Sequence, residues 1–111
     1  MGRLLTNKKM EKKMKKFRNY KEHLFKRLKD PKAAAAYLNA ALEDEDPKVF
    51  LIALKDITDA NGGVAKLAKE TDLNRESLYR TLSQRGNPRL HSLVAILQAC
   101  HLDISIRPAA A

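Results

Sequence analysis

The chain has 111 residues, enough for one domain with a modest hydrophobic core but too few for two. Aromatic residues make up only 5% against 44% hydrophobic residues, and this composition favours a helical protein over a β-sandwich or barrel. The single cysteine excludes an internal disulfide, and we find neither a secretory signal pattern nor an apolar run of about 18 residues. We therefore expect an all-α protein of the cytoplasm, without a membrane partner.

The net charge of +9 is concentrated at one end of the chain. Residues 1 to 30 carry twelve lysine and arginine residues against three acidic ones, a net charge of +9. The rest is neutral in sum, because residues 31 to 61 hold three basic against six acidic residues, and residues 62 to 111 hold seven against four. Two basic regions favour a polyanionic partner, nucleic acid first. For residues 1 to 16, a solvated lysine tail is the simpler alternative.

The first predicted element is a basic N-terminal arm, residues 1 to 29. Its segment "MEKKMKKFRNYKEHLFKRLKD" places apolar residues with helical spacing among lysines. We expect the arm to be a basic amphipathic helix or partly disordered, with disorder centred on residues 1 to 15. Composition does not choose among a membrane, a nucleic acid and a protein as the partner of such a helix.

A helix-turn-helix domain is expected over residues 30 to 111. Asp30-Pro31, Asp46-Pro47 and Asn87-Pro88 each combine an N-cap with a proline at the first helical position, so each predicts a helix start within two residues. Apolar periodicity then predicts helices near 31–43 and 47–60, a short helix carrying Val64 and Leu67, and helices near 74–83 and 88–101. The expected fold is therefore a five-helix all-α domain preceded by the arm.

The last segment, "LDISIR" at residues 102 to 107, changes the apolar period from helical spacing to alternation. Alternation is typical of a half-buried strand, and the chain offers no partner strand. We therefore expect pairing with a second copy in a homodimer, through Leu102, Ile104 and Ile106. The alternative is a C-terminal tail packed as coil.

Residues 63 to 83 have the layout of a helix-turn-helix motif. In the second helix Leu78 and Leu82 share an inner arc, while long polar side chains occupy the opposite one. A recognition helix requires this arrangement, because its first turns enter the major groove of DNA. Arg matches the two acceptors of guanine, Glu accepts from cytosine, and a Tyr ring contacts a thymine methyl or a phosphate. An ordinary amphipathic surface helix has the same division of faces, so the pattern alone does not decide.

The string "VAKLAKETDLNRESLYRTLSQRGNPRLHSLVAILQAC" resembles the λ-repressor-like helix-turn-helix family of the HigA type. From about Tyr20 to Ile106, the order of motifs also resembles the probable addiction-module antidote family, the antitoxin halves of bacterial toxin–antitoxin operons. The resemblance implies a DNA-binding antitoxin that neutralises a RelE/ParE-like toxin and represses its own operon as a dimer. We expect the toxin surface within residues 15 to 45, which lie outside the DNA motif.

Carried over by position, the resemblance assigns base contacts to the exposed face of the second motif helix, namely Arg75, Glu76, Tyr79 and Arg80. Asn74 takes the capping position near a phosphate, and DNA-backbone contacts fall to Lys66, Ser83, Arg85 and Arg89. One departure concerns Val64, which stands where many relatives have a phosphate-anchoring Gln. We expect Val64 to pack in the core, which leaves the backbone N–H groups of Gly63 and Val64 to meet a phosphate.

The remaining polar residues predict no further chemistry. The three histidines and Cys100 lack metal-site spacing, and no phosphate loop, paired carboxylates or nucleophile elbow occurs. We expect no enzyme activity, no cofactor and no metal. Two other functions stay open: a stand-alone transcription regulator without a toxin, and an interaction or RNA-binding adaptor dominated by its basic arm.

Overall fold

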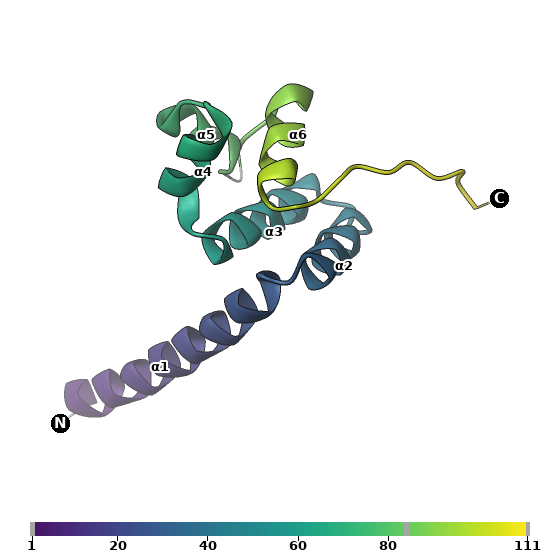
Figure 1. Ribbon diagram of the computed structural model, residues 1–111. Helices are drawn as coiled ribbons and strands as arrows, with labels where there is room; N and C mark the ends of the chain where they lie inside the picture. The colour runs from purple at the N-terminus through teal and green to yellow at the C-terminus, as the bar shows by residue number, and fades with distance from the viewer. Residues whose placement is uncertain (1, 84, 111) are drawn as a thin grey trace.

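Six α-helices make up the regular structure of the chain in the computed structural model, which describes residues 2 to 83 and 85 to 110. In chain order they are α1 (Gly2–Leu28), α2 (Pro31–Leu42), α3 (Pro47–Ala60), α4 (Gly63–Thr71), α5 (Arg75–Thr81) and α6 (Leu90–Ala99). Figure 1 shows α3 at the centre, with α1 and α2 on one side and α4 to α6 on the other. The expected all-α class is therefore confirmed.

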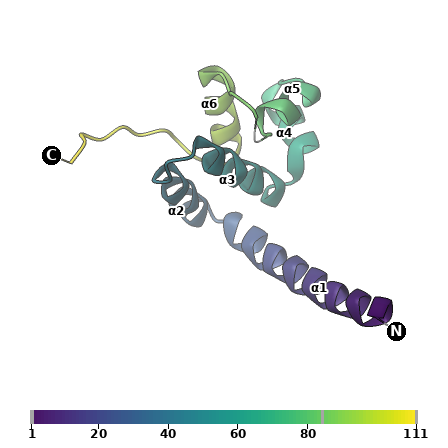
Figure 2. The same cartoon turned by 180° about the vertical axis from the view of Figure 1, so that it is seen from behind.

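The five-helix count is wrong, because the N-terminal arm is itself a continuous helix. α1 spans 27 residues and projects away from the other helices in both views (Figures 1 and 2). Its last two turns are anchored by Leu24, which is 7% exposed, and Leu28, which is 1% exposed. The arm therefore ends inside the core, and its final residues belong to the packed part of the molecule.

The Asp-Pro signals place the starts of α2 and α3 correctly. The Asp30 carboxylate accepts a hydrogen bond from the Lys32 backbone N–H at 3.2 Å, and Asp46 accepts one from the Lys48 N–H at 2.9 Å. Each carboxylate satisfies an N–H group that lacks a partner within the helix, and each following proline loses nothing by having no N–H. Local chemistry therefore fixes both boundaries.

One hydrophobic core joins all six helices around α3. Leu54 and Ile57 of α3 are fully buried, and they pack with the buried side chains Leu28, Leu78, Leu82 and Ile96. Burying a leucine contributes about 1.5–3 kcal/mol, so this cluster is the principal stabilising feature of the fold. The helices on either side of α3 are thus held in one body.

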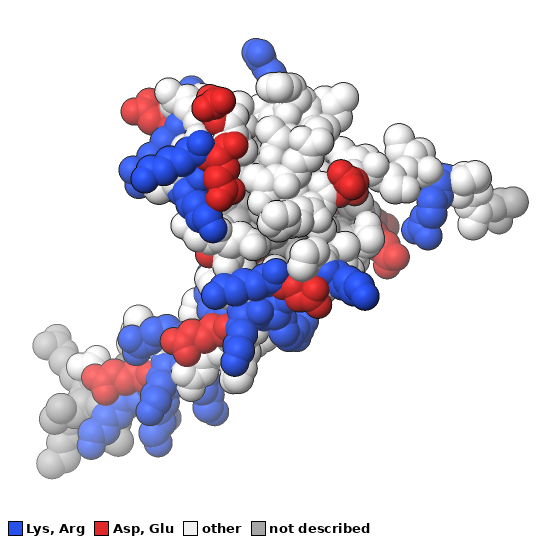
Figure 3. Space-filling model, in the orientation of Figure 1, with Lys and Arg blue, Asp and Glu red and all other residues white. Residues whose placement is uncertain are grey.

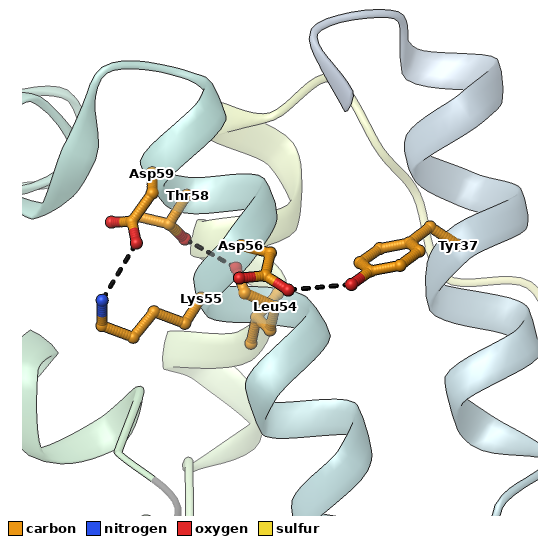
Figure 4. A network of polar contacts seen from close by, with 6 residues as sticks. All are labelled: Tyr37, Leu54, Lys55, Asp56, Thr58 and Asp59. Atoms are coloured by element: carbon orange, nitrogen blue, oxygen red, sulfur yellow. Dashed lines mark hydrogen bonds and ion pairs between the residues drawn. The ribbon is translucent and has the colours of Figure 1, made fainter. Parts of the chain in front are cut away.

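A polar contact also ties α2 to α3 at the edge of the core (Figure 4). The Tyr37 hydroxyl donates to the Asp56 carboxylate at 2.8 Å. Burial, together with this hydrogen bond and the negative charge of Asp56, raises the pKa of Tyr37 to about 12. The protonated phenol is therefore the form that the folded protein stabilises.

The predicted strand at residues 102 to 107 is wrong. The structure describes these residues, and it contains no strand within residues 2 to 83 and 85 to 110. After α6 the chain turns at His101, which has φ 63°, and then leaves the helices as an extended coil (Figure 1). Leu102 still packs against the helices, because its N–H donates to the Leu97 carbonyl oxygen at 2.8 Å and its side chain is only 9% exposed. An alternating sequence forms a strand only beside another strand, and an all-helical chain supplies none.

Candidate nucleic-acid interface

Two glycines begin the first helix of the motif. Gly62 has φ 110° and Gly63 has φ 84°, in the left-handed region that other residues rarely adopt. This reversal sets α4 at an angle to α3 and brings Val64 and Leu67 into the core, at 5% and 4% exposure. The expectation that Val64 is a core residue is confirmed.

The turn between α4 and α5 is built from local hydrogen bonds. The Thr71 hydroxyl donates to the Leu67 carbonyl at 2.7 Å and accepts from the Leu73 N–H at 3.3 Å. Asp72 between them has φ 56°, which ends α4, and Leu73 packs against the core. The turn is therefore tight, and it fixes the position at which α5 begins.

Asn74 caps α5, as its sequence position predicts. Its side-chain oxygen accepts hydrogen bonds from the Glu76 N–H at 2.8 Å and the Ser77 N–H at 3.3 Å. Both donors would otherwise lack a partner in the first turn of a helix. Because the oxygen is engaged in the cap, the amide NH₂ group is the part of the Asn74 side chain that can donate to another group.

The two faces of α5 divide as the sequence predicts. Leu78 is 1% exposed, and Leu82, which ends the helix, is 2% exposed. Both side chains pack α5 against the core. The outward face carries four exposed side chains, Arg75, Glu76, Tyr79 and Arg80. The Arg75 guanidinium carbon lies 5.8 Å from the centroid of the Tyr79 ring, within cation–π range, so these two side chains are oriented together.

The four predicted DNA-backbone contacts, Lys66, Ser83, Arg85 and Arg89, are also exposed. Lys66 lies 3.8 Å from Glu70 one turn along α4. The Ser83 hydroxyl donates to the Arg80 carbonyl at 2.8 Å, so it finishes the last turn of α5. Arg89 is the N-cap residue of α6, without a side-chain capping bond. Ser83 is thus partly engaged within the protein, whereas Arg85 and Arg89 extend from the loop that follows α5.

Gly86 also shapes this surface, although no role for it was predicted from the sequence. A Cβ atom added to it would collide with the Thr81 carbonyl oxygen and lie 2.7 Å from the Arg80 carbonyl oxygen. The loop therefore passes against the end of α5 at a distance that only glycine permits, and this contact positions the neighbouring Arg85. The available signal was the glycine of "RGNP", directly after a predicted recognition helix.

Lysine and arginine side chains gather over the α4–α5 end of the molecule, with acidic groups among them (Figure 3). A second and denser basic surface runs along α1. The face between them is largely uncharged. The surface over α4 and α5 is therefore of mixed charge with a modest basic excess, and the strongest positive field belongs to the arm.

The other candidate groups lie apart from this surface. Cys100 is buried, and its burial, followed by the nearby Glu70 charge, raises the pKa of its thiol. In the described parts of the chain, no three His, Cys, Asp or Glu side chains gather so that they could hold a metal ion. None of the helices that the structure describes combines the length and apolar character needed to cross a bilayer.

Comparison with known proteins gives two matches that cover most of the chain. The model of a family described as probable addiction module antidote proteins matches residues 18–108. An uncharacterized protein of Haemophilus influenzae is 31% identical over 71 residues, which are 64% of this chain and 72% of the relative. No solved structure matches. The family match begins within α1 and takes in every later helix, so it agrees closely with the extent of the resemblance read from the sequence.

Proposed function

Because the chain belongs to the family of probable addiction module antidote proteins, we propose that it is an antitoxin that also represses its own operon. In this proposal α4 and α5 bind operator DNA as a helix-turn-helix, the active repressor is a homodimer, and the toxin it neutralises is of the RelE/ParE type. The proposed DNA-binding domain is formed by residues 30 to 111, and residues 1 to 29 form an arm whose last turns pack on that domain through Leu24 and Leu28.

The observation that carries DNA binding is the outward face of α5. A seven-residue helix with four long exposed polar side chains is held by two nearly fully buried leucines, Leu78 and Leu82. The exposed side chains are therefore displayed on a backbone that cannot easily move, which is what base reading requires. The cation–π contact between Arg75 and Tyr79 further limits the motion of these two exposed side chains.

Some of the proposed contacts supply the choice of DNA sequence, and the others supply affinity. Arg75 and Arg80 read guanine acceptors, Glu76 accepts from cytosine, and Tyr79 contacts a thymine methyl or a phosphate. Lys66, Asn74, Ser83, Arg85 and Arg89 contact the phosphate backbone, where they add affinity but little choice of sequence. Base readers thus occupy α5, and backbone contacts surround it.

The proposed homodimer is supported by the exposed apolar residues of the C-terminal coil. Ile104 is 48% exposed and Ile106 is 92% exposed, although both are large apolar side chains. The beginning of this coil also borders a groove of about 310 Å³ with apolar lining from α2 and α6, including Leu42 and Leu93. Leu102 supports its own protomer's core and so contributes to the dimer only indirectly.

DNase I footprinting with the purified protein on the DNA upstream of its gene tests the proposal. We expect a protected site with two related half-sites about one helical turn apart, since a two-fold dimer presents two copies of α5. A matched DNA of scrambled sequence is the control. Equal affinity for the two DNAs would reject sequence-specific repression, and co-purification with the neighbouring gene product separates an antitoxin from a stand-alone regulator.

A further inference from the structure

A groove with apolar walls crosses the surface beside the C-terminal end of α6. Its first part, of about 310 Å³, lies between α2 and α6 and begins at residues 102 to 105. Its second part, of about 580 Å³, continues to residues 85 to 88 in the loop after α5. Both parts are lined by Leu42, Phe50 and Leu93, so they form one continuous groove, called the α2–α6 groove below.

The C-terminal coil, residues 103 to 110, carries apolar side chains that its own chain leaves uncovered. It borders one end of the α2–α6 groove and then projects away from the helices in both views (Figures 1 and 2). Ile104 is 48% exposed and Ile106 is 92% exposed. In an extended segment, side chains two residues apart point to the same side, so the two isoleucines form one apolar edge.

The groove and the coil are complementary to each other. The groove exposes a large apolar side chain at the junction of its two parts, because Leu42 is 61% exposed. The coil supplies an apolar edge of the kind that such a groove can cover. Since the coil leads away from the groove of its own chain, a second copy related by a two-fold axis can bring the two features together. Each copy then offers one coil and one groove, which is the condition for a closed dimer.

The length of the coil allows this exchange without any change in the helices. Leu102 stays in the core of its own chain, where it is 9% exposed. The eight residues from 103 to 110 span up to about 27 Å when fully extended. The coil can therefore reach a neighbouring copy while its first residue remains anchored.

Charge agrees with a second copy as the occupant of the groove. The coil carries one acidic and one basic residue, so two coils approach each other without net repulsion. The exposed acidic run of residues 43 to 46 follows Leu42 directly, and Glu45 lines the second part of the groove together with two basic residues. Arg107 follows Ile106 directly. A coil that places Ile106 against Leu42 thus brings the Arg107 guanidinium to the side of the groove that holds this acidic run.

We propose that the homodimer forms by exchange of the C-terminal coil, and that residues 104 to 107 of each copy lie in the α2–α6 groove of the other. The two isoleucines contact the apolar wall formed by Leu42, Phe50 and Leu93. This inference rests on the proposed function, because it requires the homodimer, and it identifies the surface that receives the coil. The contact needs no strand pairing, since apolar side chains and one ion pair hold the coil.

The test is sedimentation equilibrium of the full chain and three variants at micromolar concentration. The groove variant, Leu42→Lys, places a charge in the groove at a side chain that is mostly exposed in the single chain. The control variant, Ala40→Lys, adds the same charge to an exposed position of α2 that does not line the groove. The coil variant is Ile104→Ser with Ile106→Ser. Circular dichroism should show equal helix content in all four proteins.

We expect the groove variant and the coil variant each to raise the dissociation constant of the dimer about tenfold or more, and the control variant to dimerise like the unchanged chain. An equimolar mixture of the groove and coil variants should contain more dimer than either variant alone. In the mixed dimer, the intact coil of the groove variant meets the intact groove of the coil variant. Coil-to-coil pairing predicts no such recovery.

A groove variant that dimerises like the unchanged chain, or a mixture without recovery, would overturn the exchange and leave the proposed homodimer standing. An unchanged chain that is monomeric at this concentration would overturn both. If Leu42→Lys loses helix content, Arg107→Glu in the exposed coil replaces it. This variant should weaken the dimer more at low salt than at high salt, because it opposes the acidic run of residues 43 to 46. An unaltered dissociation constant for Arg107→Glu would then overturn the exchange.

Discussion

Arg75 shows how a single residue of this surface combines exposure with order. Its guanidinium stacks near the Tyr79 ring, 5.8 Å from the centroid, on a helix whose first turn is capped by Asn74. A long side chain loses rotamer freedom when it binds a base, and stacking in the free protein reduces that loss. Arg89 stands on a loop, at the N-cap of α6, and we assign it only a phosphate contact.

Arg75→Ala should therefore cost about 1–3 kcal/mol on the operator, with little loss on random DNA. Arg89→Ala should weaken binding to both DNAs and reduce the dependence of affinity on salt. Electrophoretic mobility-shift titrations at two salt concentrations measure both effects. Equal losses on operator and random DNA for Arg75→Ala would show that this residue is not a base reader.

Tyr37 should make the free energy of unfolding decrease as the pH rises in the alkaline range. Its pKa is about 12 in the folded protein, because of burial and the bond to Asp56, and about 10 in an unfolded chain. Between these values the folded protein keeps a proton that the unfolded chain releases. The stabilisation is therefore complete below pH 10 and is lost as the pH rises from 10 to 12.

Urea unfolding at pH 8 and pH 11 checks this expectation. The free energy of unfolding should fall more between the two pH values for the unchanged protein than for Tyr37→Phe, which has no phenol to ionise. Lysines titrate in both proteins, so their contribution cancels in the comparison. Identical pH dependence in the two proteins would contradict the assignment.

At the scale of elements, α5 depends on its neighbours because it is short. A helix of seven residues forms few internal hydrogen bonds and is unstable alone in water. Three features hold it: the local Asn74 cap, the burial of Leu78 and Leu82 in the core, and the close passage of Gly86 past its end. The outward face of α5 is therefore only as ordered as these supports.

Asn74→Ala should lower the free energy of unfolding by about 1 kcal/mol, because the Glu76 and Ser77 N–H groups lose their acceptor. Asn74→Ser, which keeps an oxygen at the cap, should retain most of that stability. Thermal unfolding followed by circular dichroism measures the difference between the two variants. If Asn74→Ala is as stable as the unchanged protein, the cap does not support α5.

At the scale of the whole molecule, the two strongly exposed regions lie at opposite ends of the chain. The arm of α1 carries most of the positive charge, whereas the C-terminal coil carries exposed isoleucines and few charges (Figure 3). Repulsion opposes the association of two arms but not of two coils. The charge distribution therefore favours self-association at the C-terminal end.

Ile104→Ser combined with Ile106→Ser should shift the protein from dimer towards monomer at micromolar concentration, because it removes apolar surface from the proposed interface. Ala109→Ser with Ala110→Ser, in the same exposed coil, is the control and should leave the dimer intact. Multi-angle light scattering reports the mass of each protein. An unchanged chain that is purely monomeric at this concentration would reject the homodimer.

The sequence predicted well whatever depends on near neighbours along the chain. Asp30 and Asp46 cap their helices, Asn74 caps α5, and Leu78 and Leu82 are buried, since caps and helical periodicity need only a few successive residues. The predictions for the two ends were less successful. The sequence does not decide whether residues 1 to 29 are helical, and the strand predicted at residues 102 to 107 is wrong.

By itself, the sequence therefore determined the all-α class, the bounds of α2, α3, α5 and α6 within a few residues, the presence of a short α4, the polar face of α5 and the resemblance to antitoxins. Only the tertiary structure decided which apolar residues find a partner. Leu24 and Leu28 are covered by the core while Met14 and Phe17 on the same face of α1 are not, and an alternating segment stays a coil because no strand lies beside it. Periodicity defines a face, but burial of that face depends on what packs against it.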